Sequence, residues 1–344
     1  MPALRQPPVP VIGLDVGGAN TKAAVAYDGR RAETVSEPFE VWRAPDRLAD
    51  VIAAVIGRLG HPGAAVALTT TAELVDVFAS KREGVLHVLG AARQALPGRS
   101  VRVMTTAGDL VGLEAARAAP LDCAGANWVA TALLVARSLP DAILLDCGGT
   151  TTDVIPIVDN QVAARGRTDL ERLRHDELVY TGALRTNIAA VVSQVPIGGA
   201  PCPVSSELFA ISADAHLLRS NLTAEQCTCT FPDNRGPSLP EVRSRLARVV
   251  CADPEQLADG DLEAIAAAVE EGQIASIAAA LRRVADRVST GAPVIAVGVG
   301  AFLARAAAER CGLPIASDAT LPSLLSGPAG DVAAAVALSV LGRA

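Results

Sequence analysis

Two short glycine-rich segments carry the residues best suited to chemistry. The first reads Asp-Val-Gly-Gly-Ala-Asn-Thr-Lys over residues 15–22, and the second reads Asp-Cys-Gly-Gly-Thr-Thr-Thr-Asp over residues 146–153. Each follows a short apolar run and precedes another, which predicts a tight turn between two strands. Backbone N–H groups of such turns can close around phosphate oxygens, and the acids suit a bridging Mg²⁺ ion. A lone copy is more typical of a plain hairpin, but two copies predict a phosphate clamp.

Charge and hydrogen-bonding capacity assign roles within these turns. Asp15 and Asp153 are the candidate Mg²⁺ ligands, directly or through water, because Mg²⁺ takes only one or two carboxylates. Lys22 would neutralise a phosphate as a point charge. The alternative is that Lys22 lies on a strand surface and that the threonines simply favour β structure. The candidates for further phosphate contacts are Gly17, Gly18, Asn20, Thr21, Gly148, Gly149, Thr150, Thr151 and Thr152.

Length and composition fit a soluble enzyme. The 344 residues can form two lobes with separate cores, built mainly from Ala, Val, Leu and Ile because only 3% of residues are aromatic. With 30 basic against 37 acidic residues, the chain gives no electrostatic reason to expect a nucleic-acid partner. The N-terminus lacks the apolar core of a signal peptide, and no apolar run approaches the ~18 residues of a membrane helix. We therefore expect a cytoplasmic protein without a membrane partner.

Seven cysteines are scattered without a C-x-x-C spacing. The odd number argues against a disulfide framework, so free thiols are expected. Cys202, His216, Cys227 and Cys229 could in principle gather a zinc ion. Cys-x-Cys is nevertheless a poor spacing for a chelating turn.

Hydrophobic periodicity predicts alternating strands and helices. The first part of the chain reads as strands within 11–42, 64–68 and 101–104, with helices at 48–59, 72–80, 83–96 and 113–119. A helix from residue 127 connects to the second hairpin at 142–163, and looser segments follow at 165–240. The last part reads as helices at 242–250 and 261–288, then a strand and helix at 293–309.

The duplicated hairpins resemble those of the actin, Hsp70 and sugar-kinase superfamily. Residues 293–303, with Gly298 and Gly300, resemble the strand–glycine–helix element on that superfamily's adenosine side. Residues 327–331 and the alanine-rich stretch after them resemble its second interlobe connection, although an ordinary capped terminal helix is the simpler interpretation. The resemblance implies a two-lobed, ribonuclease H-like α/β fold with a phosphate-binding cleft between the lobes. Lobe I would comprise residues 1–125 with 316–344, and lobe II residues 126–315.

Further segments narrow the resemblance to the hydantoinase/oxoprolinase family. They are residues 69–85, the second glycine-rich turn and residues 180–186. Subunits of that family are far longer than this chain, which over nearly its whole length is similar to a compact subgroup encoded with the tetrahydromethanopterin-linked one-carbon pathway. The stretches that carry this similarity are 17–24, 126–132, 168–173 and 207–214.

The subgroup implies a transferase of methanofuran or methylofuran biosynthesis. Such an enzyme joins an aminomethylfuran methyl diphosphate to the phenol oxygen of a tyramine, glutamyltyramine or tyrosine derivative, and diphosphate leaves. The resemblance implies Mg²⁺ and small-molecule substrates but no requirement for ATP, whose binding stays open together with a homodimeric state. An ATP-dependent kinase or an amidohydrolase is the alternative enzyme, supported by Gly298 and Gly300, and a nucleotide-sensing regulator is the non-catalytic alternative. The loop 228–236 departs from the subgroup pattern and leaves the contacts to the phenol undecided.

A phenol must lose its proton as it attacks, so a base is required. Glu73 is the candidate through the family-like segment, with Asp76 as its rival, although acids three apart on a helix commonly form a solvated face. Lys81, Arg185 and Thr186 are candidate substrate-binding residues, and arginine can hold a carboxylate bidentately. His87 and His175 offer no spacing typical of ligands or bases.

Overall fold

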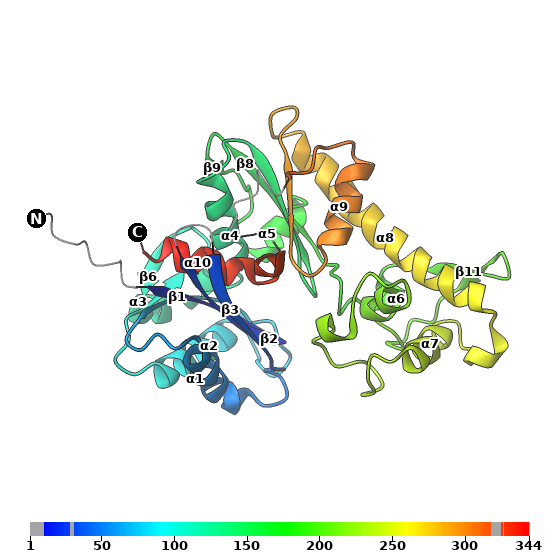
Figure 1. Ribbon diagram of the computed structural model, residues 1–344, viewed down its shortest axis with the longest axis horizontal. Coiled ribbons are helices and arrows are strands. Elements are labelled where there is room, and N and C mark those ends of the chain that lie inside the picture. Colours follow the sequence, from blue (N-terminus) through cyan, green and yellow to red (C-terminus); the bar gives the residue numbers. More distant parts are fainter. Residues whose placement is uncertain (1–9, 28–30, 318–324, 326, 344) are drawn as a thin grey trace, which may run out of the picture.

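The computed structural model describes residues 10–27, 31–317, 325 and 327–343. Residues 1–8, on which the signal-peptide expectation rests, and residues 318–324 of the predicted lobe I lie outside the described residues. The described chain builds two main sheets with helices around them, and Figure 1 shows helix α10 (Ala333–Leu341) between these sheets. The expected two-lobed, actin-like α/β fold is confirmed.

The first sheet has six strands in the order β3-β2-β1-β4-β5-β6. Strand β1 runs antiparallel to β2 and parallel to β4, so the first hairpin is followed by a crossover. The strands are β1 (Val11–Gly17), β2 (Asn20–Tyr27), β3 (Arg31–Pro38), β4 (Ala65–Thr71), β5 (Val101–Met104) and β6 (Leu110–Gly112). Helices α1 (Leu48–Leu59), α2 (Lys81–Ala95) and α3 (Leu113–Ala118) complete what we call the first lobe.

Alternation along β1 decides which layer covers each face of this sheet. Ile12, Leu14 and Val16 pack into one core with α1 and α2. Gly13 faces α10, where a Cβ atom would lie only 1.8 Å from the carbonyl oxygen of Ala335. Only glycine admits this close approach of helix to strand.

The second sheet contains the second hairpin. Its strands follow the order β10-β8-β7-β13, and β9 pairs with β8. They are β7 (Ala142–Cys147), β8 (Thr152–Val158), β9 (Gln161–Val162), β10 (Leu178–Val179) and β13 (Val294–Val297). Helix α4 (Asn127–Ala136) packs with α10 and with β8. This sheet, the two-stranded β11 (Gln194–Ile197) and β12 (Ala200–Pro203), and helices α5–α9 form what we call the second lobe.

Long helix α8 (Asp259–Ala285) extends the second lobe away from the two sheets. Figure 1 shows α6 (Ser212–Leu218) and α7 (Leu239–Arg248) beside its far half and α9 (Ala301–Arg310) beside its near half. In length and composition α8 could cross a membrane, which the sequence analysis did not foresee, but half of its apolar window is buried inside the protein. Burial of that kind is typical of a core helix.

One predicted helix is wrong. Residues 72–80 form a series of turns, whereas α2 begins at Lys81. The hydroxyl of Ser80 accepts a hydrogen bond from the backbone N–H of Glu83, which is the geometry of a helix N-cap. The turns before Ser80 belong to the candidate active site.

Candidate active site

The two glycine-rich turns face one another across a cleft with a volume of about 490 Å³. Each turn lies between two antiparallel strands, β1 and β2 in the first lobe and β7 and β8 in the second. The structure thus brings together the two predicted halves of the clamp. The predicted turn residues that line the cleft are Asp15, Gly17, Gly18, Asn20, Lys22, Gly148, Gly149, Thr150, Thr151 and Asp153.

Asp15 and Lys22 are paired positions on β1 and β2. Burial raises the pKa of Asp15, and the nearby ammonium of Lys22 opposes that rise. The Lys22 ammonium also donates a 3.0 Å hydrogen bond to the backbone carbonyl of Asp331. The lysine is therefore fixed beside the acid and beside the chain that leads into α10.

The first turn offers oxygen ligands that fit Mg²⁺. Oδ1 of Asp15 and Oδ1 of Asn20 are buried and have no hydrogen-bond partner in the described residues. An oxygen-only donor set with a single carboxylate is compatible with Mg²⁺, which keeps several of its waters. Buried polar atoms without hydrogen-bond partners are unusual, and a bound cation would satisfy these two oxygens.

Asp153 has a different environment. Nη1 of Arg172 donates a 2.5 Å hydrogen bond to Oδ1 of Asp153, and both side chains are almost fully buried. The guanidinium of Arg172 also lies 4.8 Å from the ring centre of Trp128. Arg172 thus supplies positive charge beside this acid, so Asp153 and Asp15 differ in environment, and metal binding by Asp153 stays a prediction.

Strand alternation removes two predicted threonines from the cleft. Thr21 and Thr152 are fully buried, and neither lines the cleft. Thr21 precedes Lys22 on β2 and so points to the opposite face of the sheet. The hydroxyl of Thr152 donates to the backbone carbonyl of Thr181 at 2.8 Å. Both are structural residues of the hairpins.

Thr186 also has a structural role in place of the predicted substrate contact. Its hydroxyl donates to the carbonyl of Gly182 and accepts from the N–H of the same residue. These bonds close the turn that packs beneath the second hairpin, where the N–H of Ala183 donates to the carbonyl of Gly148.

Gly298 and Gly300 are packing residues, and neither lines the cleft. A Cβ atom on Gly298 would lie 2.3 Å from the carbonyl oxygen of Cys147, and one on Gly300 would lie 2.4 Å from its sulfur. Gly298 also has a φ of 88°, which favours glycine. The turn between β13 and α9 therefore needs these glycines to pack against the end of β7, and a nucleotide pocket beside them stays a prediction.

Glu73 lies in the turns between β4 and α2 and lines the cleft. Burial raises its pKa to about 7, with further upward contributions from Asp169 and Asp15 and an opposing one from Lys81. Oε2 of Glu73 is buried without a hydrogen-bond partner in the described residues. A carboxylate with these properties can accept a proton near neutral pH.

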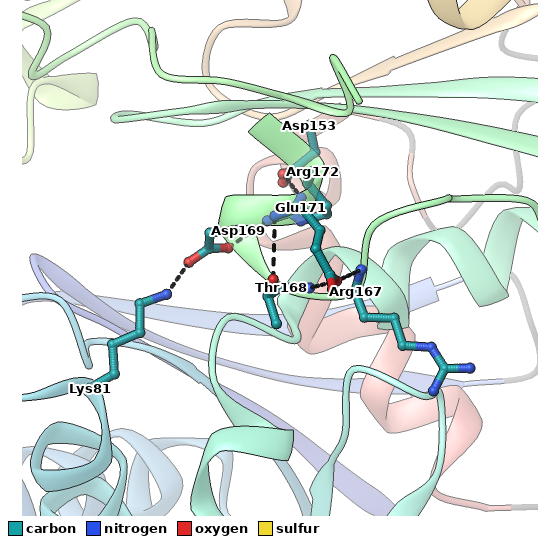
Figure 2. Close-up of polar contacts among 7 residues, drawn as sticks. All are labelled: Lys81, Asp153, Arg167, Thr168, Asp169, Glu171 and Arg172. Atoms are coloured by element: carbon teal, nitrogen blue, oxygen red, sulfur yellow. Dashed lines mark hydrogen bonds and ion pairs between the residues drawn. The ribbon is translucent and has the colours of Figure 1, made fainter. Parts of the chain in front are cut away.

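An ion-pair chain crosses from the first lobe to the second, as Figure 2 shows. Nζ of Lys81, on α2, donates to Oδ2 of Asp169 at 2.6 Å. Asp169 opens α5 (Asp169–Arg174) and accepts from Nη2 of Arg172 at 2.9 Å through its other oxygen. Arg172 in turn holds Asp153. Lys81 is held by Asp169 and does not line the cleft, and a contact between Lys81 and substrate stays a prediction.

Local capping orients this chain. Thr168 accepts a hydrogen bond from the N–H of Glu171, and the Glu171 carboxylate accepts from the N–H groups of Arg167 and Thr168. This reciprocal capping box, visible in Figure 2, fixes the first turn of α5. A fixed first turn directs Asp169 and Arg172 toward the cleft.

Arg185 and Trp42 stand at one wall of the cleft. The guanidinium of Arg185 lies 4.6 Å from the ring centre of Trp42, and no ion pair holds it within the described chain. An exposed, unpaired arginine is a candidate for an anionic substrate group, as the sequence analysis expected.

Several site residues escaped the sequence analysis. Asp169 and Arg172 belong to a stretch that supported only the family resemblance, although its Thr-x-x-Glu pattern signals a helix start. No local sequence pattern indicated that Trp42 belongs to the site. Asp146, at the start of the second turn, lies opposite Asp153 on the hairpin and does not line the cleft; burial raises its pKa to about 7, with a further upward contribution from Asp153.

The cysteines are free thiols. Within the described residues no group of three or more His, Cys, Asp and Glu side chains is placed to hold a metal ion, so the zinc alternative lacks a site. His216 instead forms a 2.8 Å hydrogen bond with Gln273, and burial lowers its pKa to about 4.

Comparison with known proteins identifies the protein family. The hydantoinase/oxoprolinase family matches residues 64–339, and the chain belongs to this family. At a TM-score of 0.55 it also resembles a nucleotide-free acetone carboxylase structure, with 12% identity over 89% of this chain and 68% of that one. At this identity the likeness concerns the fold alone.

Two archaeal relatives carry one and the same name. They are described as "(4-{4-[2-(gamma-L-glutamylamino)ethyl]phenoxymethyl}furan-2-yl)methanamine synthase". The protein of Methanocaldococcus jannaschii is 38% identical over 253 residues, which is 73% of this chain and 74% of the relative. The protein of Methanococcus vannielii is 39% identical over 117 residues, or 34% of this chain and 52% of the relative.

Proposed function

We propose that the protein is a transferase of methanofuran or methylofuran biosynthesis that joins an aminomethylfuran methyl diphosphate to a phenol oxygen and releases diphosphate. The observation that carries the proposal is the 38% identity to a synthase whose named product contains a phenoxymethylfuran ether. The cleft supports the proposal, because the glycine-rich turns and Lys22 lie in the same cavity as Glu73, a buried acid whose pKa is about 7.

The diphosphate binds between the two turns. Backbone N–H groups around Gly17, Gly18 and Gly149 donate to its oxygens, and Lys22 offsets its charge. These donors are fixed before the reaction, so they stabilise the charge that develops as the leaving group departs. A furfuryl carbon tolerates this departure because the ring delocalises positive charge.

Glu73 accepts the phenolic proton. As the phenol oxygen forms its bond to the furan methylene carbon, the carbon–oxygen bond to diphosphate breaks and its electron pair leaves with diphosphate. The phenolic proton passes to the Glu73 carboxylate, so atoms and charges balance. A base whose pKa is about 7 is well matched to this task near neutral pH.

Asp15 and Asn20 would hold Mg²⁺ through their unpartnered oxygens. When bound, the ion would neutralise charge on the diphosphate. Asp153 is held by Arg172 and contributes to the site through that arginine. The ATP-dependent kinase and the amidohydrolase are not favoured, because both named relatives are described as synthases.

The direct experiment supplies the purified protein with the furan diphosphate, γ-glutamyltyramine or tyramine, and Mg²⁺. We expect equal amounts of diphosphate and of ether product, measured by a diphosphate assay and by mass spectrometry. Diphosphate release without ether would contradict synthase activity. Substrate-stimulated formation of ADP from ATP would select the kinase or amidohydrolase instead.

A further inference from the structure

A second cavity, of about 560 Å³, adjoins the cleft. Cys229 lines both cavities and so marks where they meet. One wall belongs to the first lobe after β3, with Pro38, Phe39, Glu40, Arg43 and Ala44, and the other to the second lobe, with Glu225, Cys227, Thr228, Cys229 and Thr230. This second wall includes the start of the loop 228–236, which has no assigned role.

Hydrogen bonds between the lobes hold the two walls together. The N–H of Thr230 donates to Oε1 of Glu40 at 3.2 Å, and Nη2 of Arg43 donates to Oδ1 of Asn234 at 3.3 Å. Glu40 also pairs with Nε of Arg43 at 2.5 Å, so its carboxylate is occupied at both oxygens. The cavity is therefore a built feature of the lobe interface.

A buried arginine anchors the loop from behind. Nε of Arg245 donates to Asp214 at 2.8 Å, and its Nη1 donates to Asp233 at 3.0 Å. The guanidinium lies 4.1 Å from the ring centre of Phe231, and its side chain is fully buried. Because breaking a buried pair of this kind is costly, the loop keeps a fixed shape toward the first lobe.

The cavity carries charges of both signs. Glu225 forms no ion pair within the described residues, and hydrogen bonds from its own backbone N–H and from Thr223 lower the pKa of its carboxyl group. Arg43 on the opposite wall contacts Glu40 through Nε and Asn234 through Nη2, which leaves its Nη1 for a ligand. At the neck, the unpaired Arg185 adds positive charge beside Cys229.

We propose that this second cavity binds the zwitterionic amino-acid end of the phenolic substrate, with Arg43 contacting its α-carboxylate and Glu225 its α-ammonium. The inference rests on the proposed function and extends it to substrate choice. A phenol seated near Glu73 can extend its side arm past Cys229, where the two cavities join. A γ-glutamyl group presents an ammonium and a carboxylate on one carbon, and the cavity offers an acid and an arginine on its two walls.

The test compares γ-glutamyltyramine with tyramine, which lacks the amino-acid end. Glu225→Gln should lower kcat/KM for γ-glutamyltyramine about fivefold, as expected for loss of one exposed charge pair, and leave tyramine unchanged. Ala44→Phe, which fills the cavity without changing charge, should act in the same direction. Glu255→Gln is the matched control. Like Glu225, Glu255 is the middle residue of a three-residue 3-10 helix that ends in glutamine, but it lies outside both cavities.

Calorimetric titration of γ-glutamyltyramine should give a weaker Kd for Glu225→Gln than for Glu255→Gln. An unchanged kcat/KM ratio of the two phenols in Glu225→Gln and Ala44→Phe would overturn the assignment of the cavity while leaving the transferase intact. Absence of ether from both phenols with the unsubstituted protein would overturn the proposed function itself.

Discussion

Nη1 of Arg172 lies 2.5 Å from Oδ1 of Asp153, with 3% and 7% of the two side chains exposed. A buried guanidinium thus neutralises the acid of the second hairpin, whereas Asp15 of the first hairpin has an oxygen without a partner. The two acids occupy different positions in their turns, because Asp15 corresponds to Asp146 and Asp153 corresponds to Lys22, and they also differ in electrostatics. We therefore place the proposed Mg²⁺ site on the first hairpin.

Asp15→Asn and Asp153→Asn should separate activity from stability. Asp153→Asn leaves Arg172 buried without its charge partner and should cost about 3–5 kcal/mol of unfolding free energy. Asp15→Asn replaces a buried carboxylate whose Oδ1 has no hydrogen-bond partner in the described residues, so it should leave stability nearly unchanged while lowering turnover about a hundredfold. Urea unfolding and ether formation measure the two effects. Equal losses of stability would contradict the distinction, as would the absence of partial Mg²⁺ rescue for Asp15→Asn.

Glu73→Gln should lower kcat about 10²- to 10⁴-fold, the range for loss of a general base. The base must be ionised to act, so the rate of the unsubstituted enzyme should rise with pH through an apparent pKa of about 7. Asp76→Asn is the control, because Asp76 also lines the cleft and was the rival candidate. A larger loss in Asp76→Asn than in Glu73→Gln would reverse the assignment.

Lys81 and Asp169 form an ion pair, and substitutions of the two residues should shift the pH profile of kcat in opposite directions. Lys81 lowers the pKa of Glu73 and Asp169 raises it. Lys81→Met should therefore move the rising limb to higher pH, and Asp169→Asn should move it to lower pH. A role limited to holding the lobes together predicts equal rate losses without opposite shifts, so kcat measured from pH 5 to 9 decides between the two.

Gly125 lies between the carboxylates of Glu73 and Asp169. A Cβ atom there would lie 3.0 Å from Oδ1 of Asp169 and 3.5 Å from Oε1 of Glu73, and φ is 63°. Gly125→Ala should cost about 1–2 kcal/mol through backbone strain and should also lower kcat. Gly63→Ala, at a φ of 76° with open space around it, should lose similar stability but keep full activity. Equal activity of the two variants would show that crowding at Gly125 does not matter.

The hairpins were predictable because their signal is local. An acid, two glycines and a flanking apolar run define each turn within eight residues, and the fold class follows from their duplication. The alternation of side chains along a strand could also be predicted from the sequence. It would have placed Thr21 and Thr152 on the face away from the cleft. A helix was wrongly predicted over residues 72–80 because the apolar residues within these turns have the spacing of a helix.

Contacts between distant segments were not predictable from the residues alone. Arg172 reaches Asp153, and Lys81 reaches Asp169 across the lobes, only because the fold places α5 beside both. The raised pKa of Glu73 results mainly from burial, which a linear sequence does not display. The same limit applies to Gly298, whose conformational requirement comes from the carbonyl of Cys147 packed against it.

The most direct test of phenol attack on the furan carbon is an isotope measurement. Tyramine or γ-glutamyltyramine labelled with ¹⁸O at the phenol would be incubated with the furan diphosphate, Mg²⁺ and the protein, and both products would be analysed by mass spectrometry. We expect all of the label in the ether and none in diphosphate, because the carbon–oxygen bond of the furan substrate breaks. Label in a phosphate product, or an ether without label, would contradict the proposed reaction.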